Sequence, residues 1–95
     1  MDSVTILYWR DIPAQVIAGR GRRAEKHVLP DRFAEAIDRA AMRAGLAGSD
    51  DYLAQWRKAD GPAEPAGAVA EALEAAWGPE RLKAAALAGG VEGAA

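Results

Sequence analysis

The chain has 95 residues, a formal net charge of −2 at pH 7 and no cysteine, which already limits its chemistry. This length fits one domain with one modest hydrophobic core. The lack of cysteine excludes disulfides, thiolate metal sites and cysteine nucleophiles. The acidic balance disfavours bulk attraction to polyanions, so we do not expect nucleic acid as a partner.

The same sequence leads us to expect a cytoplasmic protein. Its first residues lack a basic stretch followed by an apolar run, so no secretory signal is expected. No apolar run approaches the ~18 residues that a transmembrane helix needs, so no membrane association is expected.

The first third of the sequence is typical of β-strands. Residues 3–10 are rich in β-branched and aromatic side chains, and both faces are apolar, so this strand is expected to be central. Asp11 and Pro13 are expected to stop it, after which residues 14–18 form a second strand. Residues 22–29 form a more polar third strand, which suits a sheet edge. The short connections exclude parallel crossovers and predict a three-stranded antiparallel meander.

Helical patterns occupy most of the remaining sequence. Apolar residues recur at helical spacing in a first helix that opens at Pro30–Asp31, and Ser49 is expected to cap a short second helix that carries Trp56. Third and fourth helices are expected over 66–77 and 79–88, after a linker-like break at 59–65. The expected fold is α+β, with three to four helices packed on one face of the meander. The predicted domain covers residues 1–88 and the predicted flexible tail residues 89–95.

Few residues can support catalysis. The sequence has one histidine, His27, and two serines, Ser3 and Ser49. We interpret His27 as a surface or half-buried strand residue rather than a catalytic base, and Ser49 as a helix cap. No spacing supports a Ser/His/Asp arrangement or a set of metal ligands. We therefore expect neither enzymatic activity nor a bound metal or cofactor.

A Gly-Arg-Gly-Arg-Arg segment at residues 19–23 has two interpretations. It is either a solvated hairpin tip or a contact for an anion or an acidic partner. The second interpretation rests on the glycines, which allow backbone amides to point at an anion, and on the guanidinium groups, which can form paired hydrogen bonds with its oxygens. It lacks the Lys-Ser/Thr and the strand-to-helix context of a phosphate-binding loop.

The aromatic residues suggest a contact surface. Tyr8 and Trp9 are adjacent and so point to opposite faces of a strand. Trp56 and Trp77 are interpreted as core residues, whereas Trp9 is assigned either to the core or to a docking surface. The predicted partner-binding residues belong to the first hairpin and the arginine-rich turn: Tyr8, Trp9, Arg10, Asp11, Arg20, Arg22 and Arg23. A homodimer through the aromatic face or an edge strand is an alternative use of this surface.

Three strings carry a family resemblance: Tyr-Trp-Arg-Asp-Ile-Pro-Ala-Gln-Val at 8–16, Leu-Pro-Asp-Arg-Phe-Ala-Glu-Ala-Ile-Asp at 29–38 and Gly-Ser-Asp-Asp-Tyr-Leu at 48–53. Over roughly residues 4–88 the chain resembles the small bacterial virulence factor domain family, named after the domain in conserved virulence factor C. Larger members join this domain to helical repeats, which implies scaffolding or protein contact. For stand-alone members the resemblance implies an accessory subunit beside an enzyme of folate- and corrinoid-dependent one-carbon metabolism.

Two functions follow from these expectations. The first is a non-enzymatic accessory or adaptor domain that acts by protein–protein contact. The alternative is a module for a phosphorylated or polyglutamylated cofactor, bound through cationic side chains of the turn and third strand: Arg20, Arg22, Arg23 and Lys26.

Overall fold

Four strands, β1 (Thr5–Trp9), β2 (Ile12–Ala18), β3 (Glu25–Val28) and β4 (Trp56–Asp60), form one sheet in the order β3-β2-β1-β4. The computed structural model describes residues 4–19 and 24–92. Every neighbouring pair of strands is antiparallel. The α+β class is therefore confirmed, and β1 occupies the interior position expected from its two apolar faces.

The fourth strand corrects the prediction of three. Residues 56–60 were assigned to the end of a helix and the start of a linker, but they pair with β1 from Trp56 opposite Trp9 to Asp60 opposite Thr5. The sequence Trp-Arg-Lys-Ala-Asp has little intrinsic strand preference, so its conformation comes from the unpaired edge that β1 offers. The helix after Ser49 is correspondingly short: α2 covers Asp50–Ala54.

The turn between β1 and β2 is tighter than expected. The last cross-strand pair joins Trp9 to Ile12, so Arg10 and Asp11 alone connect the strands, and Arg10 has a positive φ of 53°. Pro13 lies inside β2 instead of ending a strand, because a bulge between Leu7 and Tyr8 breaks the ladder beside it.

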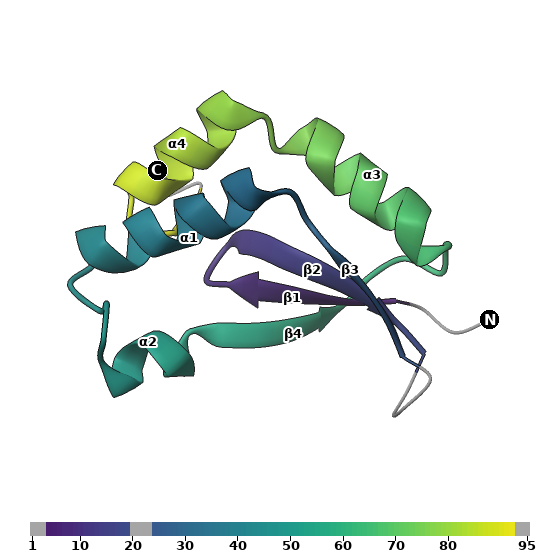
Figure 1. Cartoon of the computed structure of the whole chain (residues 1–95), viewed down its shortest axis with the longest axis horizontal. Helices are drawn as coiled ribbons and strands as arrows, with labels where there is room; N and C mark the ends of the chain where they lie inside the picture. The colour runs from purple at the N-terminus through teal and green to yellow at the C-terminus, as the bar shows by residue number, and fades with distance from the viewer. Residues whose placement is uncertain (1–3, 20–23, 93–95) are drawn as a thin grey trace.

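Two longer helices, α1 (Asp31–Arg43) and α3 (Ala66–Ala76), contact the sheet, and a third, α4 (Pro79–Leu87), packs against α1. Figure 1 shows α1 and α4 side by side over one end of the sheet and α3 over the other. Helix α2 lies next to β4, the strand that forms one edge of the sheet. At the end of α1, Gly45 has a φ of 74° and Leu46 N–H donates to the Ala41 carbonyl at 2.8 Å. The chain therefore turns sharply from α1 towards α2.

The core lies between the sheet and these helices. Its largest fully buried side chains are Trp9, Phe33, Ile12, Val16 and Pro13. Small residues such as Ala40 let α1 approach its neighbours closely. The start of the predicted flexible tail is also packed here, since Gly89 and Gly90 are buried and Asp11 N–H donates to the Gly90 carbonyl at 2.9 Å.

Candidate functional site

The structure places Trp9, expected at a contact surface, in the core. Its side chain is fully buried, and its indole N–H donates to the Tyr52 carbonyl at 2.9 Å. The rings of Trp9 and Tyr52 are 5.6 Å apart between centroids. Trp9 therefore anchors α2 to β1 and presents no surface to a partner in this conformation.

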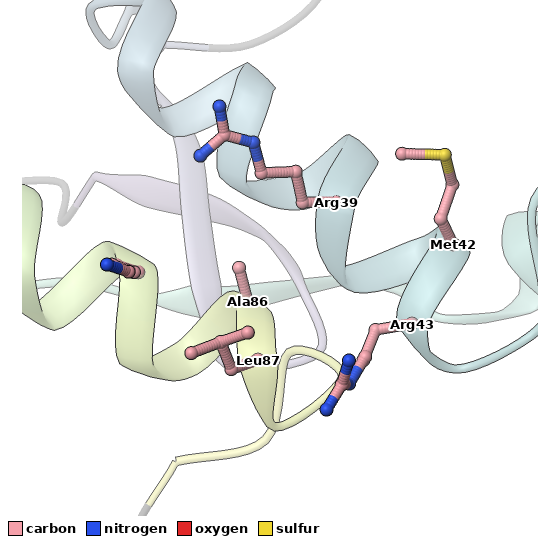
Figure 2. A pocket seen from close by; sticks show the side chains of 6 residues that line it. Arg39, Met42, Arg43, Ala86 and Leu87 are labelled. Atoms are coloured by element: carbon pink, nitrogen blue, oxygen red, sulfur yellow. The ribbon is translucent and has the colours of Figure 1, made fainter.

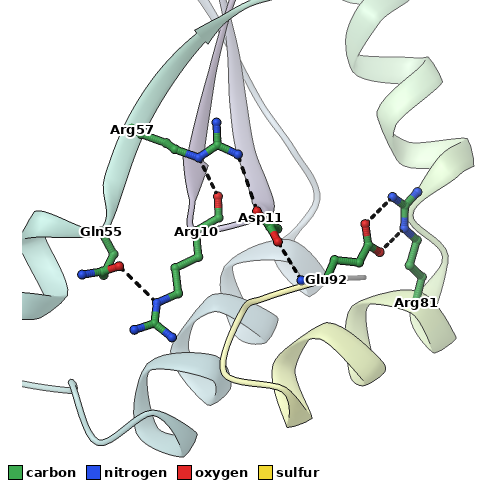
Figure 3. Close-up of polar contacts among 6 residues, drawn as sticks. All are labelled: Arg10, Asp11, Gln55, Arg57, Arg81 and Glu92. Carbon is green, nitrogen blue, oxygen red and sulfur yellow. Dashed lines mark hydrogen bonds and ion pairs between the residues drawn. The ribbon is translucent and has the colours of Figure 1, made fainter. Parts of the chain in front are cut away.

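Arg10 and Asp11 close the hairpin onto the rest of the chain (Figure 3). Arg10 Nε donates to Gln55 Oε1 at 3.2 Å, and its NH1 donates to the Gly89 carbonyl at 3.0 Å. Asp11 Oδ2 accepts the backbone N–H of Glu92 at 2.7 Å. These contacts hold the positive-φ turn against the C-terminal segment, so the side chains of Arg10 and Asp11 both have hydrogen-bond partners within the chain.

The same network extends to two further arginines (Figure 3). Arg57 Nε donates to the Arg10 carbonyl at 3.0 Å, and its guanidinium lies 4.5 Å from the ring centroid of Tyr8. Arg81 holds the Glu92 carboxylate with two nitrogens, NH2 lying 2.7 Å from Oε1. Hydrogen bonds from Arg81 keep the pKa of Glu92 below its ordinary value. Tyr8 is half-buried beneath this network.

The other predicted contact residues, Arg20, Arg22 and Arg23, lie outside the described residues. Lys26 is exposed on β3. The structure therefore describes only the hairpin half of the predicted surface.

Two of the three residues considered for catalysis, His27 and Ser49, lie on different parts of the fold, and Ser3 lies outside the described residues. His27 lies on β3, which contacts β2 and α3, and Glu25 Oε2 is 3.8 Å from its Nε2. Ser49 precedes α2, and its hydroxyl donates to the Leu46 carbonyl at 2.6 Å instead of capping the helix. Within residues 4–19 and 24–92, no three side chains are grouped as metal ligands. None of the helices described is long and apolar enough to cross a bilayer.

A groove that the sequence did not predict runs between α1 and α4. It has a volume of about 420 Å³ and is lined by Arg39, Met42, Arg43, Lys83, Ala86 and Leu87. Figure 2 shows Arg43 of α1 near Leu87 of α4, with Met42 on the side of α1 that is turned away from Ala86 in this view. Met42 and Leu87 are 64% and 55% exposed, so two large apolar side chains on adjacent helices are open to solvent in the groove.

The rim of the groove is cationic. Arg39 and Arg43 are one helical turn apart on α1, and Lys83 faces them from α4. In the described part of the chain none of the three forms an ion pair. A second hollow shares Arg39, Lys83 and Ala86 with the groove and extends it along α1 to Arg32, and this extension is also lined by the acidic side chain of Glu35. The sequence signal for this surface was the Arg-x-x-Met-Arg pattern of α1, but its partner Lys83 is distant in the chain.

Comparison with known proteins identifies the family. A family model described as virulence factor matches residues 7–85, which is most of the chain. The chain therefore belongs to the virulence factor family, as its sequence resemblance indicated. No curated protein and no solved structure matches it.

Proposed function

We propose that this virulence factor domain is a non-catalytic accessory domain that binds an acidic amphipathic helix of another protein in the groove between α1 and α4. The observation that carries the proposal is the exposure of Met42 and Leu87 inside a rim of Arg39, Arg43 and Lys83. Exposed apolar side chains within a polar rim are typical of protein contact sites.

The shape of the groove suits a helix. Its lining extends along α1 from Arg32 to Arg43, and a rise of about 1.5 Å per residue gives a length of about 17 Å. That length accommodates about three helical turns, enough for the i, i+3, i+4 and i+7 anchors by which amphipathic helices bind grooves. Arg32 donates to the Glu74 carbonyl at 3.0 Å, so it supports the end of the groove.

The charges specify the chemistry of the partner. Carboxylates beside the apolar anchors would meet three cationic side chains that have no internal ion pair among the described residues. A second copy of the chain is a poor occupant, because a two-fold contact would place the cationic rim against itself. Nucleic acid is disfavoured by the apolar floor and by the net charge of −2.

This proposal moves the contact surface away from the hairpin. Arg10 and Asp11 are engaged within the chain, and Trp9 is buried. A partner in folate- and corrinoid-dependent metabolism and the anionic-cofactor alternative both stay predictions. The cofactor alternative requires saturable binding that depends on Lys26 and the neighbouring turn and not on the groove.

The test uses a labelled helical peptide of about fifteen residues, with leucine at groove-facing positions and glutamate beside them. Its affinity is measured by fluorescence anisotropy at low and at physiological salt, since screening weakens exposed charge pairs. Arg39→Glu and Arg43→Glu should each weaken binding by about 1.4- to fivefold or more, because exposed ion pairs contribute about 0.2–1 kcal/mol and the reversed charge repels the peptide.

The matched control is Lys58→Glu on β4, which makes the same charge change at an exposed residue outside the groove. It should leave the affinity within the error of the wild type. Equal binding of a peptide with glutamine in place of glutamate, an equal effect of Lys58→Glu, or no binding of the acidic peptide would each refute the proposal. Saturable binding of a polyglutamylated folate that survives Arg43→Glu would favour the cofactor alternative.

A further inference from the structure

Tyr52 and Trp56 form an aromatic corner beside α1. Their ring centroids are 6.1 Å apart and their planes meet at 85°, so the two rings form perpendicular walls. Both rings line a hollow of about 200 Å³ between β2, α1 and β4, together with Asp38 of α1 and Gln15 of β2. Tyr52 also packs against the buried ring of Trp9 and its carbonyl accepts the Trp9 indole N–H, which ties the corner to the core.

Asp38 is the charged group of this region. It lines the hollow and also an adjoining one of about 420 Å³ formed with Ala41, Met42, Ala47, Gly48 and Tyr52. Among the residues that the structure describes, no other charged side chain lines either hollow and none forms an ion pair with Asp38. A carboxylate next to two aromatic faces attracts cations, because each ring presents a negative face.

The electrostatics of Tyr52 agree with this arrangement. Burial raises the pKa of its phenol, the negative charge of Asp38 raises it further, and a hydrogen bond with Trp56 acts in the opposite direction. The phenol therefore lies in the field of the Asp38 carboxylate, so carboxylate and aromatic walls converge on one place.

We propose that the hollow between Asp38, Tyr52 and Trp56 is a binding site for an organic cation, an alkylammonium or guanidinium group with a short apolar stem. The aromatic corner would stack on the cation, the Asp38 carboxylate would neutralise it, and the Gln15 amide offers a further polar contact. The volume is below the roughly 300–1,000 Å³ typical of drug-sized ligand sites and suits one side chain or one small amine. The site is independent of the groove between α1 and α4.

The test follows the indole N–H of Trp56 and the side-chain amide of Gln15 by nitrogen–proton NMR during titration with N-acetyl-arginine amide and with choline. N-acetyl-citrulline amide and 3,3-dimethyl-1-butanol are the matched neutral probes for the arginine derivative and for choline. Saturable millimolar shifts with the cations and none with the neutral analogues are expected. A capped tripeptide with a central arginine tests whether the natural ligand is a side chain of a partner protein or a free small cation. Tighter binding of the tripeptide than of choline indicates a partner's side chain, and weaker binding indicates a free small cation.

Two variants make the result specific. Asp38→Asn should weaken the cation affinity by about fivefold or more, because it removes the charge that the ligand meets. Glu35→Gln changes the same charge on the same helix but does not line the hollow, so it should have no effect. Absence of shifts, equal shifts with the neutral probes, or equal effects of the two variants would overturn the proposal. The spectra themselves report whether each variant is folded.

Discussion

Substitution of Gly90 by alanine tests how the C-terminal segment closes over the hairpin. A Cβ atom at Gly90 would lie 2.8 Å from Trp9 Cζ3 and 3.1 Å from Trp9 Cε3. Trp9 is fully buried, so its ring cannot swing away into solvent. Gly90 also has a φ of 92°, a conformation that an L side chain rarely adopts.

The expected cost has two parts. The left-handed backbone costs about 1–2 kcal/mol for a residue with a Cβ. Overpacking against a fixed side chain costs about 1–3 kcal/mol. Gly90→Ala should therefore lower the free energy of unfolding by about 2–5 kcal/mol, a large share of the ~5–15 kcal/mol that stabilises a typical domain. Urea unfolding measures this loss, and at a typical slope of about 1–3 kcal/mol per molar the midpoint should fall by about 1 M or more.

Gly45→Ala is the matched control, because Gly45 has a φ of 74° but no atom within 4 Å of its added Cβ. It should lose only the backbone part, about 1–2 kcal/mol. Equal losses for the two variants would show that close packing of Gly90 against Trp9 contributes nothing. No loss in either would refute the argument from the positive φ as well.

Three further substitutions test separate contacts. The carboxyl pKa of Glu92 is lowered in the folded chain, so the stability it contributes should be present above its ordinary pKa and lost as the pH falls through the lowered value. Arg81→Gln should return that pKa towards normal in a carbon-detected NMR titration, and an unchanged titration would contradict the pairing. Asp38→Asn should lower the pKa of Tyr52, followed at its phenol carbon, because it removes a charge that raises it; an unaltered phenol pKa would place Asp38 elsewhere. Trp9→Phe should cost about 1–3 kcal/mol in urea unfolding, because it removes the indole N–H that donates to the partly buried Tyr52 carbonyl, and a loss near zero would count against that hydrogen bond.

Local patterns accounted for most of the fold. The β-branched run of β1, the polar composition of β3 and the apolar spacing of α1 each express a preference that the tertiary structure keeps. Strand β4 was missed because its residues are paired with β1 across about fifty positions of sequence. Alternation and propensity describe neighbours in the chain, so they carry little information about such a partner.

The predicted contact surface illustrates a second limit. The predicted surface combines aromatic and charged groups: Tyr8, Trp9, Arg10 and Asp11. Such a combination is typical of a binding surface and equally of a contact between two parts of the same chain. The structure engages Arg10 and Asp11 with Gln55, Gly89 and the backbone of Glu92, all distant in sequence. Composition could not distinguish the two uses, because the difference lies in whether the chain itself supplies the partners.

The groove and the aromatic corner lie along the same helix with opposite charge. Arg39 and Arg43 border the groove and Asp38 lines the hollow of the corner, while Met42 lines the groove and the adjoining hollow but not the one between Asp38, Tyr52 and Trp56. Met42→Ala and Leu87→Ala should therefore each weaken the acidic peptide and leave the affinity for the organic cation unchanged, since neither side chain lines the hollow between Asp38, Tyr52 and Trp56. Both side chains are mostly exposed, so neither substitution should disturb folding. The two titrations already described measure this difference, and a change in cation affinity on Leu87→Ala would show that the two surfaces are not separate sites.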